Sequence, residues 1–248
     1  MRYFICLSYN GTHYHGWQAQ ENARTVQDML NRALSVLLKE DIQTVGAGRT
    51  DSGVHARNYI AHFDSERLAL LSEQMNIVYK LNGILPDDIC VHRIVTMHDT
   101  AHARFDAVLR TYKYYIHRTP NPFAHEFSVY IPYNLDIEKM NEAAARLYEY
   151  EDFSAFARLH SNNKTNICKV IQAIWEETPD GLVFTIAADR FLRNMVRAVV
   201  GTLLEVGRGK ISVADFVRII ERRERGAAGT SAPAKGLFLE EISYDYVM

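Results

Sequence analysis

The residues from Gly46 to Ala56, GAGRTDSGVHA, gather the side chains of a polar reaction site between two apolar runs. The three glycines of this stretch allow positive φ angles or a close approach of the backbone to a ligand. Asp51 could serve as a nucleophile, and Arg49 lies two residues before it. The stretch therefore predicts a prepared site around Asp51, or else a structural turn in which Arg49 and Asp51 only pair with each other.

Other kinds of site fit these residues poorly. The glycines at positions 46, 48 and 53 lack G-x-G-x-x-G spacing, and no Gly-Lys-Ser/Thr follows, which argues against dinucleotide and P-loop binding. The nearby histidines have no recognised metal-ligand spacing. No second acid lies close enough in sequence to form an obvious glycosidase pair, but a distant one could supply it. A carboxylate-dependent glycosidase or nucleosidase thus stays open.

The composition is that of an ordinary globular protein. Of the 248 residues, 48% are hydrophobic and 23% are charged, which suits one large or two modest domains. No apolar run approaches the ~20 residues of a membrane-spanning helix. The three cysteines, Cys6, Cys90 and Cys168, are far apart and predict buried free thiols in a reducing compartment. We therefore expect a cytoplasmic protein without a membrane segment.

The charge distribution is uneven. A net charge of −2 argues against non-specific coating of nucleic acid. Residues 158–235, however, hold 13 Lys and Arg against 8 Asp and Glu, an excess of +5. A second basic patch has only Asp106 nearby to oppose it and comprises Arg104, Arg110, Lys113 and Arg118. Such a basic face suits a selective RNA partner, although ordinary solvated surface gives the same pattern.

In the first part of the chain, alternation predicts a strand over residues 2–9 and another over 58–63. Thr25 with Asp28 forms a capping-box signature and predicts a helix through Leu38. A second helix is expected over about residues 65–79, followed by a turn and a strand that ends near Val95.

The second part repeats this layout. Strands are expected over 108–117, 169–177, 182–188 and 236–246, and helices from Asp136, from Asp189 through Leu204 and from Ser212. Each part pairs several strands with about two helices, which predicts an α+β protein with subdomains at 1–104 and 105–248.

The helix expected from Asp189 has a polar stripe. At 100° per residue, Arg190, Arg193, Asn194 and Arg197 fall on one face, opposite an apolar face. Solvated basic faces usually explain such stripes, but Arg197 lies within the apolar run 195–200. An arginine in that setting predicts a specific acidic or phosphate partner.

The stretch GRTDSGVHA closely resembles the signature of the TruA family of tRNA pseudouridine synthases, and the resemblance covers almost the whole chain. Further motifs match in order: residues 9–20 (YNGTHYHGWQAQ), 25–27 (TVQ), Asn82 with Leu85-Pro86 and Asp88-Ile89, Phe105 with 110–114 (RTYKY), Phe191 with Asn194 to Gly201, and 232–239 (APAKGLFL). Several ordered motifs are far more specific than one. Thr111 departs from the pattern, since a basic residue often precedes the tyrosine there, and Arg193 occupies a variable position.

The resemblance implies two ferredoxin-like subdomains, with a mainly antiparallel sheet running through both and helices on one face. It implies an isomerase that converts uridine to pseudouridine in the tRNA anticodon stem-loop, at tRNA positions 38, 39 and 40, and acts as a homodimer. In this reading Asp51 is the nucleophile, Arg197 is its guanidinium partner, and Tyr112 stacks on the target base. The reaction oxidises and consumes nothing, so no cofactor and no metal is expected.

The resemblance also implies which residues contact RNA. Arg49 would enter the RNA stack when the target nucleotide leaves it. The family's RNA-contacting segment corresponds to Ala101, His102, Ala103, Arg104 and Phe105, and a weaker match assigns Ser161, Lys164 and Thr165 to a second loop, with Arg193 as a further contact. A non-catalytic RNA-binding module of similar fold remains the alternative to an enzyme.

Overall fold

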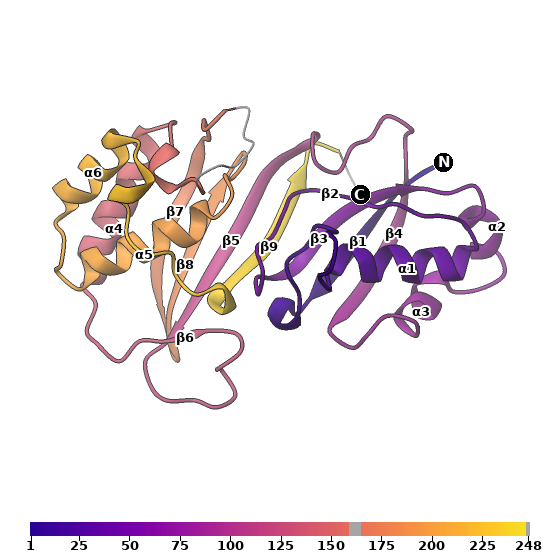
Figure 1. The fold of residues 1–248 in the computed structure, drawn as a ribbon, viewed down its shortest axis with the longest axis horizontal. Helices are drawn as coiled ribbons and strands as arrows, with labels where there is room; N and C mark the ends of the chain where they lie inside the picture. Colours follow the sequence, from indigo (N-terminus) through magenta and orange to yellow (C-terminus); the bar gives the residue numbers. More distant parts are fainter. Residues whose placement is uncertain (159–164, 247–248) are drawn as a thin grey trace. The chain divides into compact units, whose positions relative to one another are not determined.

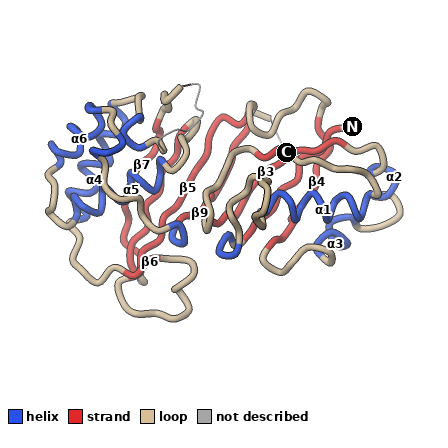
Figure 2. The backbone as a smooth tube through the Cα atoms, viewed as in Figure 1, coloured by secondary structure: helices blue, strands red, loops and turns tan. Residues whose placement is uncertain are grey.

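A computed structural model describes residues 1–158 and 165–246, and it has the mixed α+β composition expected from the sequence (Figures 1 and 2). Backbone proximity divides the chain into two compact units. Unit 1 comprises Met1–Val108 together with the residues from Leu239 onward, and unit 2 comprises Leu109–Phe238.

The strands of unit 1 form an antiparallel arrangement around a buried central strand. They are β1 (Arg2–Tyr9), β2 (Val45–Gly46), β3 (His55–Asp64) and β4 (Ile89–Met97). Their order is β4-β1-β3, β2 pairs with β3, and the final strand β9 (Leu237–Tyr244) is the neighbour of β3. Ile5 lies opposite Ala61 on β3 and opposite Ile94 on β4. Residues Tyr3 to Leu7 are buried on both faces, which explains the nearly continuous apolar character of this segment.

The helices of unit 1 are α1 (Val26–Leu38), α2 (Leu68–Ser72) and α3 (Ile77–Asn82), with a short 3-10 turn, η1, at Gly11–His13. The cap predicted for α1 is confirmed, because the Thr25 hydroxyl accepts the Asp28 N–H at 3.3 Å. The single helix expected over 65–79 is wrong. Asn76 takes an extended backbone conformation and caps α3 by accepting the Tyr79 N–H at 3.0 Å, so the helical path is interrupted there.

The strands of unit 2 are β5 (Ala107–His117), β6 (Val129–Tyr130), β7 (Val170–Thr178) and β8 (Gly181–Ala188). Their order is β5-β8-β7 with antiparallel pairing, and β6 pairs with β5 in parallel. The hairpin predicted at Pro179-Asp180-Gly181 is confirmed, since β7 and β8 pair back from Thr178 and Gly181. Tyr112 on β5 lies opposite Ile186 on β8.

The helices of unit 2 are α4 (Ile137–Ala145), α5 (Met195–Gly207) and α6 (Val213–Arg222), and Figure 1 shows them gathered beside β7 and β8. Short 3-10 turns lie at η2 (Arg146–Glu149), η3 (Ser154–Phe156), η4 (Arg225–Ala227) and η5 (Ala234–Gly236). The predicted capping box at the start of α6 is confirmed, since Ser212 and Asp215 bond reciprocally. The core of this unit contains buried aromatic rings, among them Phe156, Phe184 and Phe216.

The helix expected from Asp189 starts six residues later. Asp189 accepts the backbone N–H groups of Lys169 and Arg190, at 2.8 and 2.7 Å, and so closes a turn. Asn194, the residue before α5, has a left-handed backbone with φ 66°. Arg190 and Arg193 therefore precede the helix, and the prediction of a helical stripe through them is wrong.

The cysteines are free thiols, as expected, and Cys6 and Cys168 are buried. Cys90 is exposed, so the expectation of burial fails there: in β4 it occupies an outward position between buried Ile89 and Val91. Within the described part of the chain, we find no helix of the length and apolar character needed to cross a membrane.

Candidate active site

The loop from Gly46 to Ala56 leaves unit 1's sheet between β2 and β3. Gly46 pairs with Ala61, and the Ala47 N–H donates to the Ile60 carbonyl at 2.9 Å. A side chain at Gly46 would place a Cβ 2.1 Å from the Tyr59 hydroxyl and 2.4 Å from Trp17 Nε1. Close packing therefore requires a glycine at this position.

An aromatic cluster of Tyr9, Trp17 and Tyr59 supports the first half of the loop. Trp17 and Tyr59 stack with ring centroids 4.1 Å apart, and Tyr9 lies 5.6 Å from Tyr59. The hydroxyl of Tyr59 donates to the Gly48 carbonyl. The hydroxyls of Tyr9 and Thr50 share a buried hydrogen bond of 2.9 Å. The main chain on the N-terminal side of Asp51 is thus fixed by buried groups.

The second half of the loop is fixed by η1 and its surroundings. The Val54 N–H donates to the Asp51 carbonyl at 3.1 Å, while Gly53 takes a positive φ of 76° that completes the turn. The buried His55 accepts the Gly11 N–H at Nδ1, at 3.1 Å, so in that bond the imidazole is an acceptor.

Asp51 is half-buried between the buried residues Thr50 and Val54, and Arg49 is exposed. Asp51 is thus partly exposed in a loop whose flanking residues are buried. A restrained backbone next to a partly exposed acid is an arrangement that a nucleophile could use.

A second element of unit 1, residues Ala101 to Phe105, is shaped by two histidines. The buried His62 accepts the Ala103 N–H at Nδ1, at 3.1 Å. His102 accepts the N–H groups of Arg104 and Phe105 at 3.2 and 3.3 Å, and its ring stacks on Phe105 at 4.2 Å. These contacts expose the side chains of Arg104 and Phe105, the latter by 76%, and bury Ala101 and Ala103.

The histidine pair of this segment is held neutral. Burial lowers the pKa of His62 to about 4, and the positive charge of Arg2 and the nearby His102 lower it further. The pKa of His102 is also lowered, first by its own burial. Neutral imidazoles are required here, because Nδ1 of each ring accepts backbone N–H groups.

In unit 2, Tyr112 is half-buried on β5 and meets Phe191 edge to face, at 5.2 Å and 90°. Tyr114 lies two residues further along the strand and hence on the same face. The Tyr114 hydroxyl donates to the Pro233 carbonyl at 2.9 Å. Burial raises the pKa of Tyr114, and the positive charge of Arg197 opposes that rise, so the Arg197 guanidinium lies near this hydroxyl.

Arg197 is the third residue of α5 and is tied to the chain at Ala232. Its Nε donates to the Ala232 carbonyl at 2.7 Å, and the Ala232 N–H donates to the Arg197 carbonyl at 2.9 Å. Asn194 reaches the same segment through a 2.7 Å hydrogen bond from Nδ2 to the Ser231 hydroxyl. Half-buried and oriented by these bonds, Arg197 has the fixed position that a specific anionic partner needs.

The remaining predicted contacts lie elsewhere in unit 2. Arg193 is exposed, and its carbonyl accepts the Arg158 N–H at 3.0 Å. Thr165 is exposed and its hydroxyl accepts the Ile167 N–H at 3.1 Å. Ser161 and Lys164 fall outside the described residues. Of the predicted site residues, Arg49, Asp51 and 101–105 therefore belong to unit 1, and Tyr112, Arg193 and Arg197 to unit 2.

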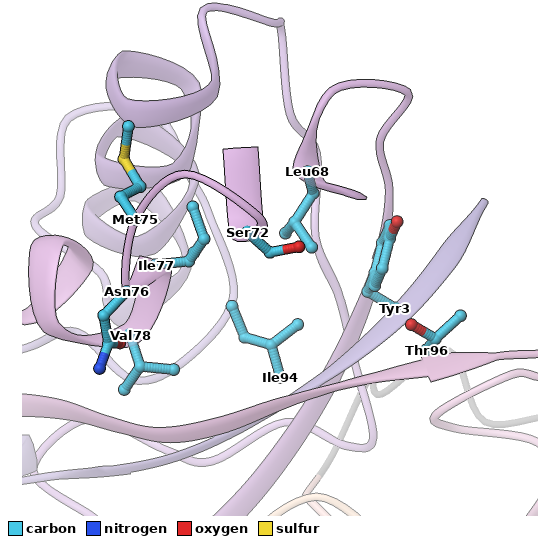
Figure 3. A pocket seen from close by; sticks show the side chains of 9 residues that line it. All are labelled: Tyr3, Leu68, Ser72, Met75, Asn76, Ile77, Val78, Ile94 and Thr96. Atoms are coloured by element: carbon cyan, nitrogen blue, oxygen red, sulfur yellow. The ribbon is translucent and has the colours of Figure 1, made fainter. Parts of the chain in front are cut away.

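Two cavities involve none of the predicted site residues. One, of about 310 Å³, lies in unit 1 between the α2–α3 region and strands β1 and β4 (Figure 3), and its walls include Tyr3, Leu68, Ile77 and Ile94. The other, of about 760 Å³, lies in unit 2 and carries several carboxylates, among them Glu149, Asp152 and Glu221. Among the residues the structure describes, no group of three or more His, Cys, Asp or Glu side chains could hold a metal ion.

Sequence reasoning missed the residues that support the site. The cluster of Tyr9, Trp17 and Tyr59 and the pair His62 and His102 are not adjacent in sequence. The one usable signal is the polar-aromatic composition of residues 13–18, HYHGWQ, where a large buried side chain in a loop implies a packing partner.

Comparison with known proteins places this chain in a family. The family model described as tRNA pseudouridine synthase matches residues 5–106 and 143–245. A protein of Bacteroides fragilis named tRNA pseudouridine synthase A is 54% identical over 98% of this chain and 96% of its own length. The protein of the same name from Bacillus subtilis is 40% identical, over 99% of this chain and 100% of its own. The loop around Asp51 thus occurs in a chain that belongs to the tRNA pseudouridine synthase family, as its resemblance to the TruA family predicts, and that is an intramolecular isomerase.

Proposed function

We propose that this chain converts uridine to pseudouridine in the anticodon stem-loop of tRNA, at positions 38, 39 and 40, with Asp51 as the nucleophile. The observation that carries the proposal is the construction of the Asp51 loop. Its flanking residues Thr50 and Val54 are buried and hydrogen-bonded, while Asp51 itself is only half-buried. The names of the related proteins support the choice of tRNA as substrate.

The proposed reaction balances without a cofactor. The C1′–N1 bond of uridine breaks, the base turns, a C1′–C5 bond forms, and the proton on C5 is lost while N1 gains one. Asp51 forms a transient covalent bond to the nucleotide, or stabilises the intermediate that has lost the bond to N1. Arg197 supplies a guanidinium that can bond to an anionic group. Tyr112 stacks on the base, a contact worth ~1–3 kcal/mol.

RNA binding in this proposal uses the exposed side chains of both units. Arg49 occupies the space left in the RNA stack by the extruded nucleotide, whose unstacking costs a few kcal/mol. Arg104 and Phe105 offer a phosphate contact and a stacking surface, and both are exposed. Residues 161–165 and Arg193 are further proposed RNA contacts.

We also propose two ferredoxin-like subdomains, at 1–104 and 105–248, with one sheet through both. The proposed protein is a cytoplasmic homodimer.

The test is release of tritium from C5-labelled uridine in tRNA by the wild-type protein and by Asp51→Asn. The exposed Asp41→Asn serves as a control for the loss of one carboxylate in the same unit. Wild type and Asp41→Asn should release tritium, and Asp51→Asn should release none above background. If the wild type releases none, the activity is wrong. If Asp51→Asn retains full activity, the nucleophile is wrong.

The same reaction mixture separates the alternatives. A nucleosidase or glycosidase would liberate free uracil and leave an abasic site, whereas an isomerase keeps the base attached. A non-catalytic RNA-binding module would bind the tRNA and release neither tritium nor base. Chromatography of the digested tRNA should therefore show pseudouridine and no free uracil.

A further inference from the structure

The two residues that follow Asp51 are both bonded to one carbonyl group. The Ser52 hydroxyl donates to the Tyr14 carbonyl at 3.1 Å, and the Gly53 N–H donates to the same oxygen at 3.2 Å. The turn that ends the Asp51 segment therefore takes its position from the main chain of Tyr14. A displacement of the Tyr14 main chain would therefore displace Ser52 and, with it, the adjacent residue Asp51.

Tyr14 is itself anchored at the other end of its side chain. It is 1% exposed, so its ring cannot reach a substrate, and its hydroxyl donates to the carboxylate of Asp88. Arg24 covers the ring at 4.8 Å from the centroid, and its Nη2 donates to the same hydroxyl at 3.1 Å. Burial and the adjacent Asp88 both raise the pKa of Tyr14, which keeps it a phenol with a proton to donate.

Asp88 has a defined position because the turn around it is closed. Its carbonyl accepts the Asn10 N–H at 2.9 Å, which joins the turn to the segment that contains Tyr14. The Asn82 side chain exchanges two 2.8 Å hydrogen bonds with the backbone of Val91 and fixes the start of β4. The motif of residues 9–20 and the motif that contains Asp88 are thus joined by the hydrogen bond from the Tyr14 hydroxyl to Asp88. The proposed chemistry uses neither motif.

We propose that Tyr14 is a positioning residue, held by Asp88 and covered by Arg24, that fixes the loop carrying Asp51 in its reactive conformation. The inference rests on the proposed role of Asp51. In this proposal Tyr14 acts through the loop and not on the substrate, because its ring is buried and its carbonyl accepts the bonds from Ser52 and Gly53. Its contribution is to turnover rather than to tRNA binding.

Tyr14→Phe tests this by removing only the hydroxyl, and Tyr3→Phe is the matched control. Tyr3 is also a buried tyrosine of unit 1, at 2% exposure, but its hydroxyl lies beside Met1 Sδ at the cavity of Figure 3. We expect Tyr14→Phe to lower kcat about tenfold or more, with KM for tRNA changed by less than about twofold. Tyr3→Phe should leave both constants within about twofold. Equal kcat values for the two variants would overturn the proposal.

Amide hydrogen exchange of the free protein distinguishes positioning from general destabilisation. In Tyr14→Phe, exchange of the peptide that contains residues 52–54 should be faster than in the wild type. The carbonyl that accepts the Gly53 N–H remains, but the bond to Asp88 no longer holds it in place. Exchange in β1 and β3 should be unchanged, as it should be everywhere in Tyr3→Phe. Unchanged exchange at 52–54 would overturn the proposal even if kcat fell.

A double-mutant cycle between Tyr14→Phe and Asp88→Asn adds a third measurement. Since one hydrogen bond joins these residues, the two losses of kcat should be less than multiplicative, whereas Tyr14→Phe and Tyr3→Phe should multiply. Multiplicative loss for the first pair would overturn the proposed coupling. Hydrogen exchange does not depend on the chemical role of Asp51, so it tests the position of the loop by itself. If Asp51→Asn retained activity, that result would refute only the proposal that Asp51 is the nucleophile.

Discussion

The Asp51 loop of unit 1 and helix α5 of unit 2 position the predicted site residues Asp51 and Arg197 in different ways. The loop has no repeating backbone structure, and its conformation depends on hydrogen bonds with scattered residues such as Tyr9, Gly11 and Tyr14. Arg197, by contrast, projects from a regular helix whose other residues are mostly buried and apolar. One additional pair of bonds, to Ala232, orients its guanidinium and the adjoining chain.

This difference predicts how each region responds to substitution. A loop held by individual hydrogen bonds loses its geometry when one donor is removed, and the core need not unfold. A helix held by packing keeps its geometry until the packing itself fails, and then stability falls with it. Removing a single polar side chain at the Asp51 loop should therefore lower activity more than stability, while substitutions around α5 should lower both together.

The largest expected effect comes from two glycines, one in each region. A Cβ at Gly11 would lie 2.0 Å from the Val54 carbonyl oxygen, and one at Gly201 would lie 1.9 Å from the Thr230 oxygen. Since the backbone must move in both cases, Gly11→Ala and Gly201→Ala should each lower the free energy of unfolding by about 3 kcal/mol. Chemical denaturation measures this.

The matched controls for these variants are Gly48→Ala and Gly226→Ala, where a Cβ meets nothing within 4 Å. Both should change stability by no more than about 0.5 kcal/mol. If Gly11→Ala is as stable as Gly48→Ala, the contact between η1 and the Asp51 loop is not tight, and η1 does not fix the position of the loop.

The next effect is a dependence of stability on pH that arises from His62. Its pKa in the folded protein is about 4, below the usual 6.5, so as the pH falls below 6.5 the unfolded chain takes up the proton first. Stability should therefore decrease between pH 6.5 and 4, by at most about 3 kcal/mol, and change no further from this residue below pH 4. Denaturation midpoints at several pH values measure the slope.

His117 of unit 2 is the natural comparison for His62. Burial also lowers the pKa of His117, whose Nδ1 shares a 2.7 Å hydrogen bond with the Ser128 hydroxyl. We expect His62→Gln to flatten the pH dependence more than His117→Gln does, because the shift is larger at His62. An unchanged slope in His62→Gln would contradict the assignment.

Much of this architecture is predictable from sequence because it depends on local patterns. Alternation locates β1 over its full length, and the cap signatures at Thr25 and Ser212 locate α1 and α6. The start of α5 is not predictable in this way. Asp189 has the composition of a helix cap, but its carboxylate is used by Lys169, which lies 20 residues earlier in the chain.

The candidate site is predictable only in part, for a related reason. Glycines, an acid and an arginine in one stretch predict a site around Asp51 with Arg49 beside it, since both lie in one short segment. The residues that hold this segment come from positions 9 to 17, 59 and 88, and no sequence periodicity relates them. Their identity depends on how β1, β3 and the turn before β4 are brought together, which only the folded chain defines.

A pair of arginines tests whether activity and stability separate as proposed. Arg49→Ala removes an exposed side chain from unit 1 and should lower kcat at least tenfold, with the melting temperature unchanged and the Kd for tRNA within about threefold. Arg197→Ala should lower kcat and also remove about 1 kcal/mol of stability, because the Ala232 carbonyl loses its donor. Equal losses of turnover and affinity in Arg49→Ala would argue against its role in the opened RNA stack.

The smallest expected effects come from two hydroxyl groups with the same cost in stability but different positions. Thr50→Val leaves the buried Tyr9 hydroxyl without this 2.9 Å partner, and Ser212→Ala removes the N-cap of α6. Each should lower the free energy of unfolding by about 1 kcal/mol. Only Thr50→Val should also lower kcat, because Thr50 immediately precedes Asp51, whereas Ser212 caps a helix that carries none of the predicted catalytic residues. Denaturation and tritium-release assays on both variants measure these effects on stability and kcat. Equal kcat values would mean that the Asp51 loop keeps its geometry without the hydrogen bond between Thr50 and Tyr9.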